Sequence, residues 1–103
     1  MSWEGGRAKL YEVREEHSFW EATAELGVPP KELDEATLSL RYRLERAPGY
    51  LTYPVPGTQY RLAFTDAPGG LTYRVIFWME IETVVLTSIA DVSDPPPLPP
   101  WFR

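Results

Sequence analysis

The chain contains no cysteine, and it has few positive charges relative to its acidic residues. Without cysteine, no disulfide can stabilise the fold and no thiolate can act as a nucleophile or metal ligand. Secreted domains of this size usually carry disulfides, so we expect a cytoplasmic protein. Ten Lys and Arg against fifteen Asp and Glu give a formal net charge of −5. This balance argues against nucleic acid as the main partner, because phosphate binding draws on an excess of cations.

Long apolar runs are also missing. No run approaches the roughly 20 residues that span a bilayer, and the first six residues lack a signal-peptide pattern, so we expect no membrane association. His17 is the one histidine, and it cannot form a zinc site without further ligands. We expect neither metal nor cofactor. The glutamates between positions 12 and 25 could suggest a divalent-ion site, but a solvated acidic face explains them more simply.

What is present is enough for one folded domain. The 103 residues are 44% hydrophobic and 14% aromatic, which is sufficient for a single modest core. We expect one α+β domain over residues 1–94 and a proline-rich tail over residues 95–103. The rings of Trp101 and Phe102 predict that the tail docks on the domain. The alternative is a proline-rich ligand for an aromatic groove on a partner.

The first part of the chain predicts a strand followed by a helix. Residues 9–14 alternate between polar and apolar side chains, as a strand does. Ser18 and Glu21 fit a capping box, in which each side chain bonds a backbone N–H at the start of a helix. A helix over residues 19–26 follows, and Gly27 suits its left-handed C-terminal cap.

A second helix is predicted from Pro30 to the turn at Pro48-Gly49. Acidic residues lie in its first turns and three arginines in its last turns, as the helix dipole favours. The arginines could instead form a basic patch for RNA. One face of this helix is apolar or small at helical spacing: Leu33, Ala36, Thr37, Leu40, Leu44 and Ala47.

The second half predicts an antiparallel β-meander with strands at residues 60–64, 71–79 and 83–92. The last two strands are apolar on both sides, so we expect them at the centre of the sheet. Residues 50–57 are too rich in proline for a central strand and read as a connector with a short edge segment. We expect Trp20, Phe77 and Trp78 in the core.

Three motifs in these strands resemble the RelE/ParE toxin superfamily. Gly57-Thr58-Gln59-Tyr60-Arg61-Leu62 is similar to the family's Gly-x-x-Tyr-Arg-aliphatic strand. Tyr73-Arg74-Val75-Ile76-Phe77 is similar to its Tyr-Arg-Val-Ile-Tyr strand, and residues 83–90 are similar to its closing strand. The resemblance covers residues 9–92 and implies an N-terminal strand and helical hairpin packed on an antiparallel β-meander.

The resemblance also implies a function. The chain would be the toxin of a toxin–antitoxin pair, inactivated by a cognate antitoxin protein. The RelE branch cleaves messenger RNA on the ribosome, whereas the ParE branch acts on DNA gyrase. Arg61 and Arg74 fall where the family's sheet arginines fall, and they would be the catalytic residues. A guanidinium can hold the scissile phosphate and stabilise the charge of the transition state.

The chain departs from this family at the residues that finish the catalytic site. Ala63 stands where a further basic residue is common, and residues 90–94 read Ala-Asp-Val-Ser-Asp where the family often has His-Arg or Lys-Arg and then Tyr. No tyrosine follows Tyr73. Two hypotheses therefore stay open: a toxin with a degenerate site, and a catalytically silent protein-binding module of the same fold. Arg61 and Arg74 could also be solvated residues or members of cross-strand ion pairs.

Overall fold

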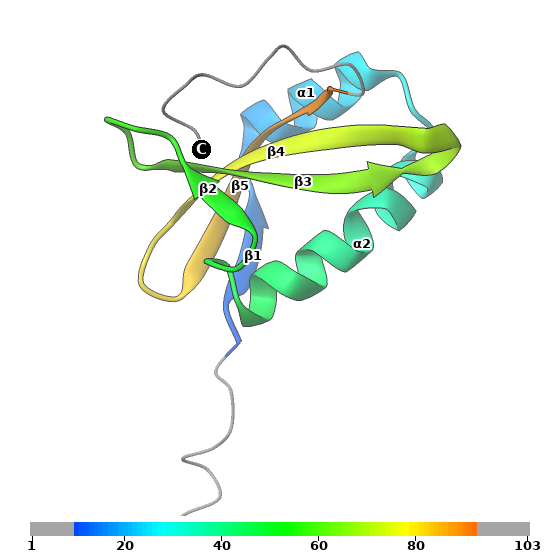
Figure 1. Cartoon of the computed structure of the whole chain (residues 1–103). Helices are drawn as coiled ribbons and strands as arrows, with labels where there is room; N and C mark the ends of the chain where they lie inside the picture. The colour runs from blue at the N-terminus through cyan, green and yellow to red at the C-terminus, as the bar shows by residue number, and fades with distance from the viewer. Residues whose placement is uncertain (1–9, 93–103) are drawn as a thin grey trace, which may run out of the picture.

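The computed structural model describes residues 10–92, which form a five-stranded sheet and two helices (Figure 1). This is the predicted α+β class. The sheet order is β1-β5-β4-β3-β2. A short 3-10 turn, Pro68–Gly70, joins β3 to β4. The elements are β1 (Glu12–Glu15), α1 (His17–Leu26), α2 (Pro30–Arg46), β2 (Thr52–Pro54), β3 (Tyr60–Ala67), β4 (Leu71–Met79) and β5 (Thr83–Asp91).

Strands β2 to β5 pair antiparallel in sequence order, so the predicted meander is confirmed. The central position of β4 and β5 is confirmed too, and the connector contains the expected short edge strand, β2. Strand β1 pairs parallel with β5. A parallel pair needs a long crossover connection, and the two helices between β1 and β2 supply it.

Helix α1 begins differently from the prediction. Its N-cap residue is Glu16, and no side chain caps the helix, so the capping box of Ser18 and Glu21 was wrong. The hydroxyl of Ser18 instead donates to the carbonyl of Thr87, at 2.8 Å. Thr87 is skipped where the β4–β5 register shifts, which leaves its carbonyl available. Gly27 does form the left-handed C-terminal cap, with a φ of 67°.

Helix α2 packs its predicted face on the sheet. Ala36, Thr37, Leu40 and Leu44 are buried, and Leu33 is half-buried against the core. The hydroxyl of Thr65 on β3 donates to the carbonyl of Ala36, at 2.9 Å, and so ties the helix to the sheet. Ala47 was wrongly placed on this face, because the helix has ended there and the residue is exposed.

One hydrophobic core lies between the helices and one face of the sheet. Phe19 of α1, two leucines of α2 and the inward residues of three strands form a single buried cluster. Phe77 is fully buried, as predicted. Trp20 was wrongly assigned to the core, since it is 56% exposed. Phe19, Ala22 and Leu26 form the inward stripe of α1, and Trp20 lies beside that stripe. Trp78 is half-buried on the opposite face of the sheet.

One sequence prediction concerns a part of the chain that this structure does not describe. The proline-rich tail, with Trp101 and Phe102, lies outside the described residues. Within residues 10–92, neither helix is long and apolar enough to cross a membrane.

Replacement of Leu44 by alanine should test the core. Its side chain is fully buried, so the substitution should lower the free energy of unfolding by about 2–5 kcal/mol. Leu38 lies on the outer face of the same helix and is 67% exposed. Leu38→Ala should therefore change stability by no more than about 0.5 kcal/mol. Urea denaturation measures both values, and equal losses would contradict the assigned core.

Candidate functional site

Arg61 lies on the face of the sheet that the helices cover. It pairs with Phe77 on β4 and is two residues from Ala63, and both of those residues are fully buried. Its Nε donates to the hydroxyl of Thr52, at 3.0 Å, and its Nη2 donates to the carbonyl of Thr52, at 3.2 Å. These bonds hold the edge strand β2 on β3. The guanidinium of Arg61 therefore has a structural role.

Arg74 lies on the opposite face. It pairs with Phe64 on β3 and with Ala90 on β5. Side chains at paired positions share a face, and successive side chains alternate between faces. Arg61 pairs with Phe77, which is three positions from Arg74, so the register places the two arginines on opposite faces. The structure does not bring them together in one site.

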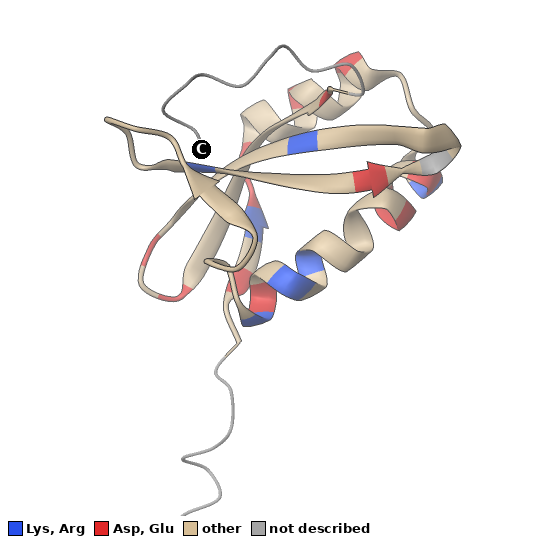
Figure 2. Cartoon of the chain, viewed as in Figure 1, with Lys and Arg blue, Asp and Glu red and all other residues tan. Residues whose placement is uncertain are grey.

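The face that carries Arg74 is largely apolar, and we call it the open sheet face because the helices pack on the other one. Most of its side chains are half-buried against one another. Aromatic rings are frequent, and one further ring, Tyr53 on β2, lies 6.3 Å from Phe64 between centroids. Arg74 is the cation in the middle strand of this face (Figure 2). The apolar and aromatic part of the open sheet face, with Arg74 among it, consists of Tyr60, Leu62, Phe64, Arg74, Ile76, Trp78, Val85 and Ala90, and the same register adds the polar side chains of Arg14, Asp66, Thr72 and Ser88.

The guanidinium of Arg74 lacks a matching anion. Its Nε is buried, and no hydrogen-bond partner for it exists among residues 10–92. Asp66 lies on the same face opposite Thr72, but no ion pair joins it to Arg74 in the described chain. A buried donor without a partner is costly, and a charged donor more so. An anionic group from a partner would remove that cost.

Among residues 10–92, the residues adjacent to Arg74 on its face carry no acid or base, and the carboxylate of Asp66 lies diagonally from it. Its neighbours by register are Phe64, Ala90, Thr72 and Ile76, and none of these is an acid or base at neutral pH. His17 lies at the start of α1 with its side chain 88% exposed, 4.0 Å from Glu21. In residues 10–92, no group of three His, Asp or Glu side chains could hold a metal ion.

Tyr73 precedes Arg74 and points the other way, into the core, where it is 1% exposed. Burial raises the pKa of its phenol, and the negative charges of Asp91 and Glu32 raise it further. The phenol therefore stays protonated at neutral pH and cannot serve as a base there. Its place in the core separates it from the open sheet face.

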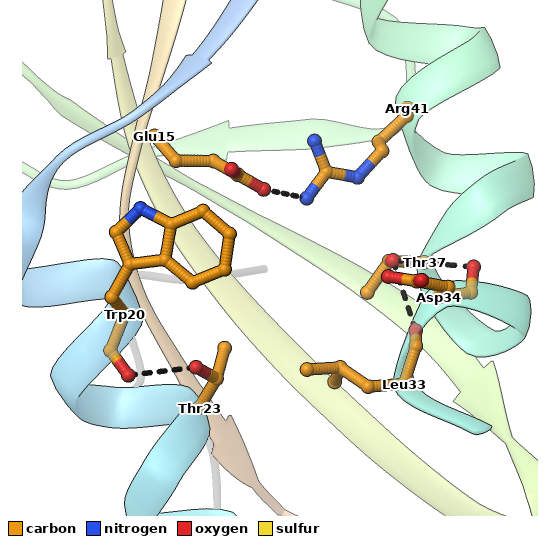
Figure 3. Close-up of polar contacts among 7 residues, drawn as sticks. All are labelled: Glu15, Trp20, Thr23, Leu33, Asp34, Thr37 and Arg41. Carbon is orange, nitrogen blue, oxygen red and sulfur yellow. Dashed lines mark hydrogen bonds and ion pairs between the residues drawn. The ribbon is translucent and has the colours of Figure 1, made fainter. Parts of the chain in front are cut away.

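Two polar contacts between distant segments could not be found from the sequence. Arg41 on α2 forms an ion pair with Glu15 at the end of β1, and both side chains are largely buried (Figure 3). This contact explains Arg41 better than the helix dipole does. The indole N–H of Trp78 donates to the carboxylate of Glu16, at 2.7 Å. Both contacts join residues far apart in the chain, and no local pattern marks such pairs.

The two arginines should differ in their effect on stability. Arg61→Ala removes two hydrogen bonds to Thr52 and should lower the free energy of unfolding by about 1–3 kcal/mol. Arg74→Ala removes a buried donor that has no partner among residues 10–92, so it should leave the free energy of unfolding unchanged or raise it by up to about 1 kcal/mol. Chemical denaturation at neutral pH compares them. A larger loss for Arg74→Ala would show that Arg74 supports the fold.

Tyr73 should make stability fall at alkaline pH. Its folded pKa is raised above the unfolded value near 10, so the folded state keeps the proton longer. This contribution is complete below pH of about 10 and is lost as the pH rises through the folded pKa. Unfolding free energies at several pH values from about 8 to 11 should fall more for the wild type than for Tyr73→Phe. Parallel curves would show that the phenol is not shielded.

Comparison with known proteins places this geometry in a known fold. No family model matches the sequence, and no curated protein does so significantly. A chain of the toxin–antitoxin complex RelBE2 from Mycobacterium tuberculosis is similar in structure, with a TM-score of 0.62 and 21% identity over 85% of this chain and 98% of that one. The conserved hypothetical protein HP0894 from Helicobacter pylori is similar with a TM-score of 0.56 and 16% identity, over 82% and 97%. The chain therefore has a RelE-like fold, as the motifs in its strands predicted.

Proposed function

We propose that this protein is the toxin of a toxin–antitoxin pair and that it acts by binding its target through the open sheet face. The fold supports the class, since the similar chain from Mycobacterium tuberculosis belongs to a toxin–antitoxin complex. A protein antitoxin would hold the toxin inactive. The observation that carries the mode of action is the buried Nε of Arg74, which has no hydrogen-bond partner among residues 10–92 and is set among apolar and aromatic side chains.

The character of this face favours a protein target. Phe64 and Ile76 flank Arg74 on the face and offer apolar contact, which a protein surface can match. The anion for Arg74 would then be a carboxylate, bound in the bidentate geometry that arginine prefers. The net charge of −5 disfavours approach to RNA. Inhibition of a protein such as DNA gyrase fits these properties best, and such a toxin would act in the cytoplasm.

Cleavage of messenger RNA on the ribosome is the second candidate. It is supported by the matches of Arg61 and Arg74 to the family motifs and by the affinity of guanidinium groups for phosphate. Arg74 would hold the scissile phosphate and stabilise its developing charge. Arg61 would contribute indirectly, by holding β2 in place, because its guanidinium donates both of its hydrogen bonds to Thr52. General acid–base catalysis needs a positioned proton carrier, and among residues 10–92 the carboxylate on this face is that of Asp66, diagonal to Arg74 in the register.

Induction of the chain in a bacterium should arrest growth, and Arg74→Ala should relieve the arrest. The substitution removes the cation that the proposed target recognises. Arg46→Ala is the matched control, because Arg46 is an exposed arginine in the last turn of α2, away from the open sheet face, and its loss changes the net charge equally. Colony counts after induction measure the effect, with protein levels checked for each variant. Growth that the intact chain leaves unaffected would refute the toxin assignment.

The two candidate targets are separated by assays on the purified protein. Gyrase inhibition should appear as lost supercoiling of plasmid DNA, and it should weaken with Arg74→Ala. Ribosome-dependent cleavage should appear as new RNA ends in a translation extract. Cleavage without an effect on gyrase would favour the endoribonuclease, and it would require Asp66 or a group outside residues 10–92 as the proton carrier.

A further inference from the structure

A groove of about 260 Å³ separates the two helices on the side of the molecule away from the open sheet face. Figure 3 shows its walls, with Trp20 on α1 and the side chains of Leu33 and Asp34 pointing from α2 toward α1. The turn between the helices forms one end of the lining. The ion pair of Glu15 and Arg41 lies beyond the indole toward β1. The groove is lined mainly by Trp20, Thr23, Ala24, Val28, Leu33 and Asp34.

The walls combine an exposed ring with a carboxylate that no cation neutralises. The indole of Trp20 is 56% exposed although apolar residues surround it. The carboxylate of Asp34 has no ion pair or hydrogen bond in the described chain. Lys31 lies one turn earlier on α2 and makes no ion pair with it either. The hydroxyl of Thr37 bonds the backbone carbonyl of Asp34 and leaves the carboxylate unused.

The surroundings of the groove are acidic. Exposed glutamates lie on α1 and on the first turns of α2, so the outer surface here has negative charge (Figure 2). They are Glu21, Glu25, Glu32 and Glu35. The arginines of α2 gather toward its other end, at Arg41, Arg43 and Arg46, whereas Lys31 in its first turn is the one cation among these glutamates on α1 and the start of α2. A cationic group approaching the groove is therefore attracted, and an anionic one is repelled.

We propose that this groove binds an arginine side chain of a protein partner, stacked on Trp20 and paired with Asp34. A planar guanidinium stacks on an indole and bonds a carboxylate through two parallel N–H donors, which a lysine cannot do as well. The aliphatic stem of arginine would lie on Leu33 and Ala24. A wholly apolar side chain would cover Asp34 and leave its charge without a partner, which is costly. The volume suits one long side chain.

The inference is independent of the target proposed for the open sheet face. The groove uses residues of the helices, whereas Arg74 lies on the opposite face of the sheet. A toxin that fails to inhibit gyrase could still bind arginine here. Loss of arginine binding would likewise leave the role of Arg74 unchanged.

The test uses the full chain labelled with ¹⁵N at its tryptophan indoles and a helical alanine-based peptide with one central arginine between two leucines. The Trp20 signal is assigned by its absence in Trp20→Phe. Titration should shift this signal saturably. Asp34→Asn should weaken binding by about three- to tenfold, since it removes one charge and keeps the shape. A peptide with norleucine in place of arginine should lose affinity to a similar degree.

Leu38→Ala is the matched control, because Leu38 is an exposed apolar residue on the outer face of α2 and its loss should leave the titration unchanged. Asp34 is exposed, so Asp34→Asn should remain folded, which the rest of the spectrum verifies. Equal affinity for the arginine and norleucine peptides would show an apolar groove and refute the proposal. Unaltered binding by Asp34→Asn, tighter binding of a glutamate peptide, or no saturable shift would refute it as well.

Discussion

The register of the β3–β4 hairpin is the constraint on which the rest of the structure depends. Eight continuous residue pairs join the two strands, from Tyr60 with Trp78 to Ala67 with Leu71. This register turns Ala63, Val75 and Phe77 toward the helices and Arg74 away from them. A slip of one residue would bring the charge of Arg74 into the core and expose Val75. The same pairing that builds the core therefore also presents the guanidinium of Arg74 at the middle of the open sheet face.

The parallel strand β1 gives the fold its second layer. Its pairing with β5 requires the chain to cross over the sheet between β1 and β2, and the two helices make this crossover. The Glu15–Arg41 ion pair connects the end of β1 to α2, and the Ser18–Thr87 hydrogen bond connects α1 to β5. The helices are thus anchored separately on the sheet, through Phe19 for α1 and through Leu40 and Leu44 for α2. A groove remains between the two helices, because their side chains do not fill the space there.

Local patterns in the sequence were sufficient to predict the helices and strands, but not the features that depend on contacts between distant residues. The spacing of Leu40 and Leu44 identified α2, and the apolar strands around Val75 identified the centre of the sheet. The sequence did not show which face of the sheet Arg61 and Arg74 occupy. That depends on the register of β3 and β4, and an arginine is compatible with either face. The sequence around Ser18 fits a helix cap, but the hydroxyl of Ser18 donates to the carbonyl of Thr87, which is distant in the chain. Trp20 looked like a core residue by composition, and only the inward stripe of α1 shows that it lies to one side.

The two candidate surfaces place opposite demands on a partner. The open sheet face offers a cation among apolar residues, whereas the groove between the helices offers a carboxylate beside an exposed indole. They lie on opposite sides of the sheet, so one partner segment could reach both only by passing around an edge strand, β1 or β2. Strand β1 has four residues, and two of them, Glu12 and Arg14, are exposed and paired with each other at 3.4 Å. A short, charged edge resists strand addition. A partner that contacts both surfaces past β1 would therefore cross this edge without extending the sheet, with an acidic segment for the open sheet face and a basic one for the groove.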